Sequence, residues 1–178
     1  MPAASAISRA KSVRGHRVDD RRLAVWKAFL KAHSALAATL NRELEAERGM
    51  PIGWYGALLN LSRAPGGRMR MQELAGLVLL SCSGLTRLFD RMEAAGVVRR
   101  EACPQDRRGT FAVITPRGRR AFKRAAPVHL RGIQEHFARH LSDEEVAALG
   151  SALGKIVAAS EPGAPHTCEG ADRSVRLS

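Results

Sequence analysis

The order of four short segments between residues 71 and 114 constrains the fold of this chain most strongly. Two stretches carry apolar side chains at helical spacing, and only the Leu80-Ser81-Cys82 neighbourhood separates them. Two short β-type runs follow at once, residues 97–101 and 110–114, on either side of a polar loop from Pro104 to Gly109. The apolar helical positions are Met71, Leu74, Ala75 and Val78, then Leu85, Leu88, Phe89 and Met92. Helix, turn, helix and hairpin in this order predict a winged helix-turn-helix.

Longer amphipathic patterns flank this segment on both sides. A helix is predicted from Asp19 to Arg48, about 45 Å long at 1.5 Å per residue. Downstream, Thr115-Pro116 and the pair Ser142 and Glu145 are start signals for two more helices. The apolar stripes of the three helices are Leu23, Trp26, Leu30, His33, Ala37, Leu40 and Leu44, then Ala126, Leu130, Ile133 and Phe137, then Val146, Leu149, Leu153 and Ile156. One winged helix cannot cover that much apolar surface, so residues 18–48 and 117–159 are predicted to be dimerisation helices.

The two ends of the chain lack hydrophobic periodicity and are rich in Gly, Pro, Ser and charge. Residues 1–17 and 160–178 are therefore predicted to be flexible tails, the first of them basic. One domain, residues 18–159, lies between them, with the winged helix-turn-helix at residues 50–116. The predicted fold class is mainly α with a small β-hairpin.

The net charge indicates a polyanionic partner. The chain has 29 Lys and Arg residues against 17 Asp and Glu residues, a formal charge of +12. Residues 99–124 alone hold nine basic and two acidic side chains. Such a field attracts nucleic acid or an acidic membrane surface. The longest apolar run, near Leu77 to Leu80, is far below the roughly 20 residues of a membrane span. We therefore expect double-stranded DNA as the partner and no membrane.

Cysteine usage indicates the compartment. Cys82, Cys103 and Cys168 form an odd, widely spaced set without a CxxC pair, which is typical of a reducing interior. The N-terminal residues mix small and basic side chains and lack the apolar core of a signal peptide. A cytoplasmic protein is predicted.

The second helix of the predicted motif has an outer face that can contact DNA. Because its apolar side is fixed, Ser83, Thr86, Arg87, Asp90 and Arg91 face away from the core. The N-terminal part of such a helix reaches base edges in the major groove, and arginine can bind guanine there in a bidentate manner. The predicted contacts are Ser83, Thr86 and Arg87 with bases, Ser81 and Cys82 near phosphate, and Arg91 on the same face. A merely solvated helix face is the alternative.

The predicted hairpin carries adjacent arginines in its loop. Arg107 and Arg108 can enter the minor groove, whose narrow regions attract guanidinium groups. Asp106 does not favour phosphate and is expected to orient an arginine, with Arg87 or Arg108 as the partner. An ordinary exposed turn is the alternative.

At these residues the chain resembles the multiple-antibiotic-resistance regulator (MarR) family. Residues 85–100 are similar to its recognition helix and first wing strand, and residues 106–109 and 114–118 to its wing and the start of its next helix. The similarity in helix order extends over about residues 19–159. The resemblance implies interlocking N- and C-terminal dimerisation helices in a triangular dimer, and insertion of Arg108 into the minor groove. Arg107 would assist or bind phosphate.

The predicted function is a sequence-specific DNA-binding transcriptional regulator. By the resemblance it binds a pseudo-palindromic operator as a homodimer, and a small anionic or phenolic effector releases the DNA. We expect a repressor, with activation as the open alternative, and a non-specific architectural DNA-binding protein is the competing class. We find no nucleophile with a base, no paired carboxylates and no phosphate-binding glycine loop, so neither an enzyme nor a cofactor is expected.

Three further groups of residues are candidate ligand, metal or redox sites. Trp26, His33, Trp54 and Tyr55 could line a cavity for an aromatic acid, although aromatic residues at helical spacing more often belong to a core. His129, His136 and His140 could bind zinc as in metal-sensing relatives, but no cysteine or carboxylate cluster completes the set, and no metal is predicted. Oxidation of Cys82 or Cys103 could disturb DNA binding, although incidental thiols are more common.

Overall fold

The structure is a computed structural model that describes residues 19–78, 82–103 and 106–160, without the side chains of residues 82, 83 and 106–108. Internal contacts divide the chain into two compact units, residues 1–35 and 36–178. Both predicted tails lie outside the described residues, except for Ser160, which ends the last helix.

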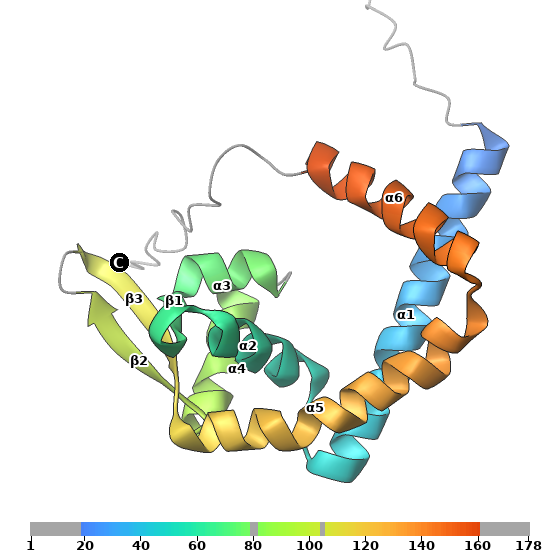
Figure 1. The fold of residues 1–178 in the computed structure, drawn as a ribbon. Helices are drawn as coiled ribbons and strands as arrows, with labels where there is room; N and C mark the ends of the chain where they lie inside the picture. Colours follow the sequence, from blue (N-terminus) through green and yellow to red (C-terminus); the bar gives the residue numbers. More distant parts are fainter. Residues whose placement is uncertain (1–18, 79–81, 104–105, 161–178) are drawn as a thin grey trace, which may run out of the picture. The chain divides into compact units, whose positions relative to one another are not determined.

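Six α-helices and three strands make up the described chain (Figure 1). Their bounds are α1 (Asp20–Arg48), α2 (Ile52–Arg63), β1 (Arg68–Arg70), α3 (Met71–Leu77), α4 (Cys82–Ala94), β2 (Val98–Cys103), β3 (Asp106–Ile114), α5 (Pro116–His136) and α6 (Asp143–Ser160). Short 3-10 turns at Pro65–Gly67 and Ala138–His140 precede β1 and α6. The mainly α fold class with a small sheet is confirmed, as is the order helix, turn, helix and hairpin.

The sheet differs from the predicted hairpin in two ways. Its order is β1-β3-β2, all antiparallel, so residues 68–70 form a third strand that the sequence did not indicate. Strand β3 begins at Asp106, with Cys103 opposite Asp106, so the polar loop predicted from Pro104 to Gly109 was too long. Main-chain pairing does not depend on the polarity of the side chains, and it therefore continues into the polar segment.

The core joins the helices of the winged motif to the sheet. The inner face of α4 is buried as predicted, with Leu85, Leu88, Phe89 and Met92 at most 7% exposed. Side chains of α2, α3, β2, β3 and α5 complete this core: Leu58, Leu61, Leu74, Val98, Ile114 and Val128.

The predicted helix starts are also confirmed. Thr115 Oγ1 accepts a hydrogen bond of 3.0 Å from the Gly118 amide at the start of α5. The Ser142 amide donates to Glu145, and the Glu145 amide donates to Ser142 Oγ, which is the reciprocal pattern of a capping box. These caps fix α5 directly behind β3 and α6 directly behind the 3-10 turn.

Helices α1 and α6 carry large apolar side chains that are exposed among the residues the structure describes. No residue of α6 is buried, and Val146, Ile156 and Val157 are each more than half exposed. In the first unit, the exposed large apolar side chains of α1 are Leu23, Val25, Trp26, Phe29 and Leu30. None of the described helices is both long and apolar enough to cross a membrane.

Candidate nucleic-acid interface

Helix α4 presents a polar face opposite its buried one. Thr86, Arg87, Asp90 and Arg91 are all exposed, in agreement with the predicted orientation of this helix. No other described residue forms an ion pair or a hydrogen bond with the guanidinium of Arg87 or Arg91. Ser83 lies on the first turn of α4, and its side chain, like the whole of Ser81, is outside the described residues.

Arg100 of β2 fastens α4 to the sheet. Its Nη2 donates to Asp90 Oδ1 at 2.7 Å and to the Thr86 carbonyl at 3.5 Å, and its Nη1 forms an ion pair with Glu93. Its amide donates to Glu93 Oε1 at 2.8 Å, and its guanidinium lies 5.2 Å from the centre of the Phe89 ring. Four residues on successive turns of α4 thus meet one arginine, so the outer face of the helix is held at a fixed angle to the sheet.

A cavity of about 280 Å³ lies beside this arginine. Its walls come from the start of α3, from α4 and from the wing strands: Arg70, Met71, Gln72, Thr86, Arg100, Gly109 and Thr110. The guanidinium carbons of Arg68 and Arg70 lie 4.0 and 5.5 Å from the ring centre of Phe111 on β3. Basic side chains therefore gather where the sheet meets the helices.

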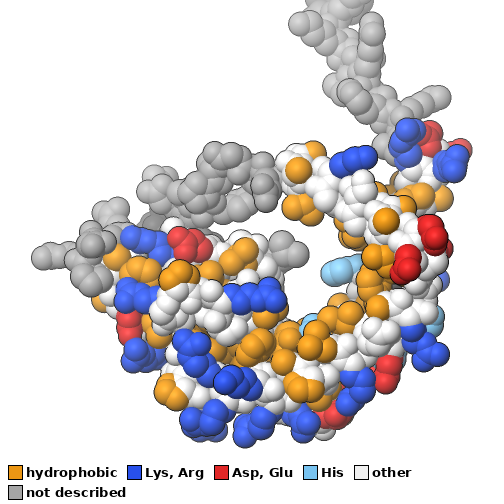
Figure 2. Space-filling view, in the orientation of Figure 1, with side chains coloured by type: hydrophobic (Ala, Val, Ile, Leu, Met, Phe, Trp, Pro, Cys, Tyr) orange, Lys and Arg blue, Asp and Glu red, His pale blue; other side chains and the backbone are white. Residues whose placement is uncertain are grey.

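The first turns of α5 extend the basic surface. Exposed basic side chains there are Arg117, Arg119, Arg120, Lys123 and Arg124. Figure 2 shows Lys and Arg side chains gathered over the sheet and the beginning of α5. Arg107 and Arg108 follow Asp106 at the start of β3, which is the end nearest the hairpin loop. Their side chains and the predicted role of Asp106 lie outside what the structure describes.

The residues predicted to line an effector cavity divide between the two units. Tyr55 on α2 is 5% exposed, and its ring centre lies 5.3 Å from Phe122 and 4.2 Å from His129 on α5. Burial raises the pKa of Tyr55, while nearby Arg63 opposes that rise, and burial lowers the pKa of His129. Trp54 Nε1 and His129 Nδ1 are buried polar atoms, and neither has a hydrogen-bond partner in the part of the chain that the structure describes.

Trp26 and His33 lie on α1 in the other unit. They flank Phe29, with ring centres 6.0 and 6.4 Å from it, and Trp26 is 54% exposed. This stripe follows one side of α1, as the helical spacing predicted.

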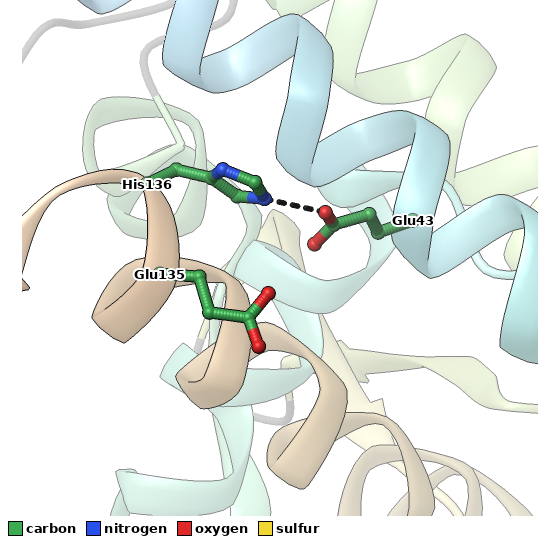
Figure 3. A group of neighbouring side chains, drawn as sticks. All are labelled: Glu43, Glu135 and His136. Carbon is green, nitrogen blue, oxygen red and sulfur yellow. Dashed lines mark hydrogen bonds and ion pairs between the residues drawn. The ribbon is translucent and has the colours of Figure 1, made fainter.

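One of the three histidines considered as candidate zinc ligands has carboxylate neighbours. His136 Nε2 lies 2.5 Å from Glu43 Oε1 of α1, and Glu135 is next to it on α5 (Figure 3). The expectation that no carboxylate cluster accompanies these histidines was wrong for His136. No local sequence pattern indicated this pairing, because Glu43 and His136 are 93 residues apart.

Known proteins are similar to this chain in fold and in sequence. A model of the MarR family matches residues 48–109. The chain is similar to Sco3205, a MarR family transcriptional regulator from Streptomyces coelicolor solved in complex with DNA, with a TM-score of 0.76 and 33% identity over 83% of this chain and 96% of that one. It is also similar to AbsC, another MarR family transcriptional regulator from Streptomyces coelicolor, with a TM-score of 0.73 and 36% identity over 80% of this chain and 96% of AbsC. MhqR of Bacillus subtilis, an HTH-type transcriptional regulator, is 32% identical over 90 residues, 51% of this chain and 61% of MhqR.

Proposed function

The chain belongs to the MarR family of transcriptional regulators, and from this premise we propose that it binds one pseudo-palindromic operator as a homodimer and represses transcription there. The exposed face of α4 carries this proposal. Thr86, Arg87 and Arg91 lie on this face. Arg100 of β2 holds the helix against the sheet through its hydrogen bond to Asp90. A rigid helix is suited to reading base edges when, as for Arg87 here, no described residue pairs with the guanidinium that it presents.

Each part of the basic surface has a distinct role in this proposal. Thr86, Arg87 and Ser83 contact bases in the major groove, with Arg87 bidentate to guanine. Ser81 and Arg91 contact the backbone at either side of that helix. Arg108 of the wing enters the minor groove, and Arg107 binds phosphate beside it. The exposed arginines at the start of α5 add charge without sequence preference, because phosphate is the same at every base pair.

The uncovered apolar faces of α1 and α6 support the homodimer. Large exposed apolar side chains recur along both helices, and contiguous faces of this kind on a single chain mark an interaction surface. Dimerisation through the two ends of the chain would place two copies of α4 about a two-fold axis, which matches a palindromic operator. Light scattering at micromolar concentration should give the mass of two chains, and the mass of one chain would refute this part.

We place the effector near Trp54 and Tyr55 of α2, both of which lie in the second unit. Trp54 Nε1 is buried and has no partner among the residues described, so it is a donor that an anionic or phenolic ligand could use. Such a ligand would release the DNA by favouring a dimer whose recognition helices no longer match the operator spacing.

Genomic footprinting followed by one matched pair of variants tests the proposed DNA contact. Arg87→Ala should lower the preference for the footprinted site by about 1–3 kcal/mol, or roughly 5- to 150-fold, at the base pair that it reads. Arg139→Ala removes the same charge from the 3-10 turn before α6 and should leave the preference unchanged. Full operator discrimination by Arg87→Ala would refute the role of Arg87. Equal affinity of the wild type for all duplexes would indicate an architectural protein instead.

A further inference from the structure

Two carboxylates and one imidazole meet where the C-terminal part of α1 crosses the end of α5. One ligand atom each of Glu43, Glu135 and His136 lies within 4.8 Å of the other two (Figure 3). We propose that these three side chains form a binding site for a divalent transition-metal ion, with Zn²⁺ as the preferred ion.

The donor set is suited to zinc. Zn²⁺ binds histidine nitrogen and carboxylate oxygen at about 2.0–2.2 Å, usually with four ligands in a tetrahedron. Three protein ligands leave the fourth position to water. Mg²⁺ and Ca²⁺ prefer oxygen ligands only, so the imidazole of His136 discriminates against both.

Glu43 has an unused acceptor at this point. Its Oε1 is paired with His136 Nε2, whereas its Oε2 is buried and has no hydrogen-bond partner among the described residues. A buried carboxylate oxygen normally has a donor or a cation beside it. The side chains of Glu43 and His136 are only 28% and 34% exposed, which limits their conformational freedom before an ion arrives.

Gly132 makes room for this carboxylate. It lies one helical turn before His136 on the buried side of α5. A Cβ atom there would lie 2.6 Å from Leu40 Cδ2 and 2.7 Å from Glu43 Oε2, closer than real Cβ contacts. Glycine therefore allows α1 to approach α5 closely enough for Glu43 to reach His136.

Neighbouring contacts hold the two helices in this register. Glu47 forms an ion pair with Arg131, and Arg48 Nε donates to the Arg124 carbonyl at 3.1 Å. Glu43 and His136 are therefore placed together by contacts outside the site. Glu135 is exposed, so its side chain is free to change rotamer and to turn its carboxylate toward an ion held by the other two ligands.

A bound ion would connect α1 to α5 through three metal-ligand bonds, one from Glu43 and one each from Glu135 and His136, in place of the present contact between Glu43 and His136. It binds the folded chain and not the unfolded one, so it should raise the unfolding temperature. This effect belongs to the protein alone and does not depend on DNA binding, so the site and the proposed function can fail separately.

Calorimetric titration of the tag-free full chain with ZnCl₂ tests the site. Because His16, His166 and Cys168 can also bind zinc, the decisive comparison is between variants. Glu43→Gln and His136→Gln should each weaken zinc binding at least about tenfold, since even outer-shell partners contribute that much. His140→Gln removes a nearby exposed imidazole outside the group and should bind zinc as the wild type does.

A second measurement separates loss of the site from loss of the fold. Saturating Zn²⁺ should raise the unfolding temperature of the wild type and of His140→Gln, but not of His136→Gln, while Mg²⁺ should raise none of them. Equal zinc affinity and equal thermal shifts in His136→Gln and the wild type would overturn the proposal. Absence of zinc binding by the folded wild type would overturn it as well.

Discussion

Replacing Gly118 by alanine should destabilise the protein, although alanine is normally the better helix residue. Gly118 is the third residue of α5 and packs on the turn between α4 and β2. A Cβ atom there would overlap the Val97 carbonyl oxygen and would lie 3.0 Å from Ile114 Cγ1. The first obstacle is main chain and cannot rotate away, so α5 has to move.

That movement also strains the cap of α5. Thr115 donates from its amide to the Val97 carbonyl at 3.1 Å and from Oγ1 to the Gly96 carbonyl at 2.8 Å. Overpacking typically costs about 1–3 kcal/mol, and each weakened hydrogen bond about 1 kcal/mol. Helix propensity returns about 1 kcal/mol. The net expectation is a loss of about 2 kcal/mol or more in the free energy of unfolding.

Urea unfolding of matched variants measures this difference. Gly56 lies inside α2, and a Cβ atom there would meet nothing within 4 Å. Gly56→Ala should therefore stabilise the protein by about 0.5–1 kcal/mol. All samples need the same protein concentration because the proposed dimerisation would contribute to stability. If Gly118→Ala proved as stable as Gly56→Ala, the packing of α5 on the winged motif would be wrong.

Three further predictions concern single side chains. Arg100→Met keeps the apolar stem but leaves Asp90 and Glu93 without their partner, so the free energy of unfolding should fall by about 1–2 kcal/mol in urea titrations; an unchanged midpoint would contradict the anchoring role. His129→Phe should make the stability less sensitive to acid. Because burial lowers the pKa of His129, the unfolded chain binds more protons than the folded chain once the pH drops below about 6.5. The free energy of unfolding therefore decreases as the pH is lowered from there, and this histidine has no such effect at higher pH. The variant should lose less stability than the wild type between pH 7.5 and 5, and equal losses would count against this. Arg108→Ala should weaken operator binding and reduce its salt slope by about 1, as fluorescence anisotropy at several salt concentrations would show.

The local pattern of the sequence was sufficient to predict α4 and the orientation of its faces. Its inner face is apolar at helical spacing, so the exposure of Arg87 and Arg91 followed from geometry alone. The three-residue strand β1 could not be predicted in this way, because three residues show no periodicity and pairing with β3 depends on tertiary contacts.

Contacts between distant segments could not be predicted from local sequence patterns either. The sequence predicted Arg100 only as one charge of a basic stretch. Its partners Thr86, Asp90 and Glu93 recur at helical spacing on α4, a pattern that is typical of one helix face contacting a common neighbour. The pairing of Glu43 with His136 depends on how α1 crosses α5, which no local pattern specifies.

Sequence-specific recognition of DNA is the central claim, and a ratio of two affinities tests it most directly. The wild-type chain is titrated at physiological salt with its footprinted operator and with a scrambled duplex of equal length and composition. A regulator that reads bases through α4 should bind the operator about 10³-fold or more tightly. Affinities within about tenfold of each other would contradict the account, because phosphate contacts alone supply non-specific binding.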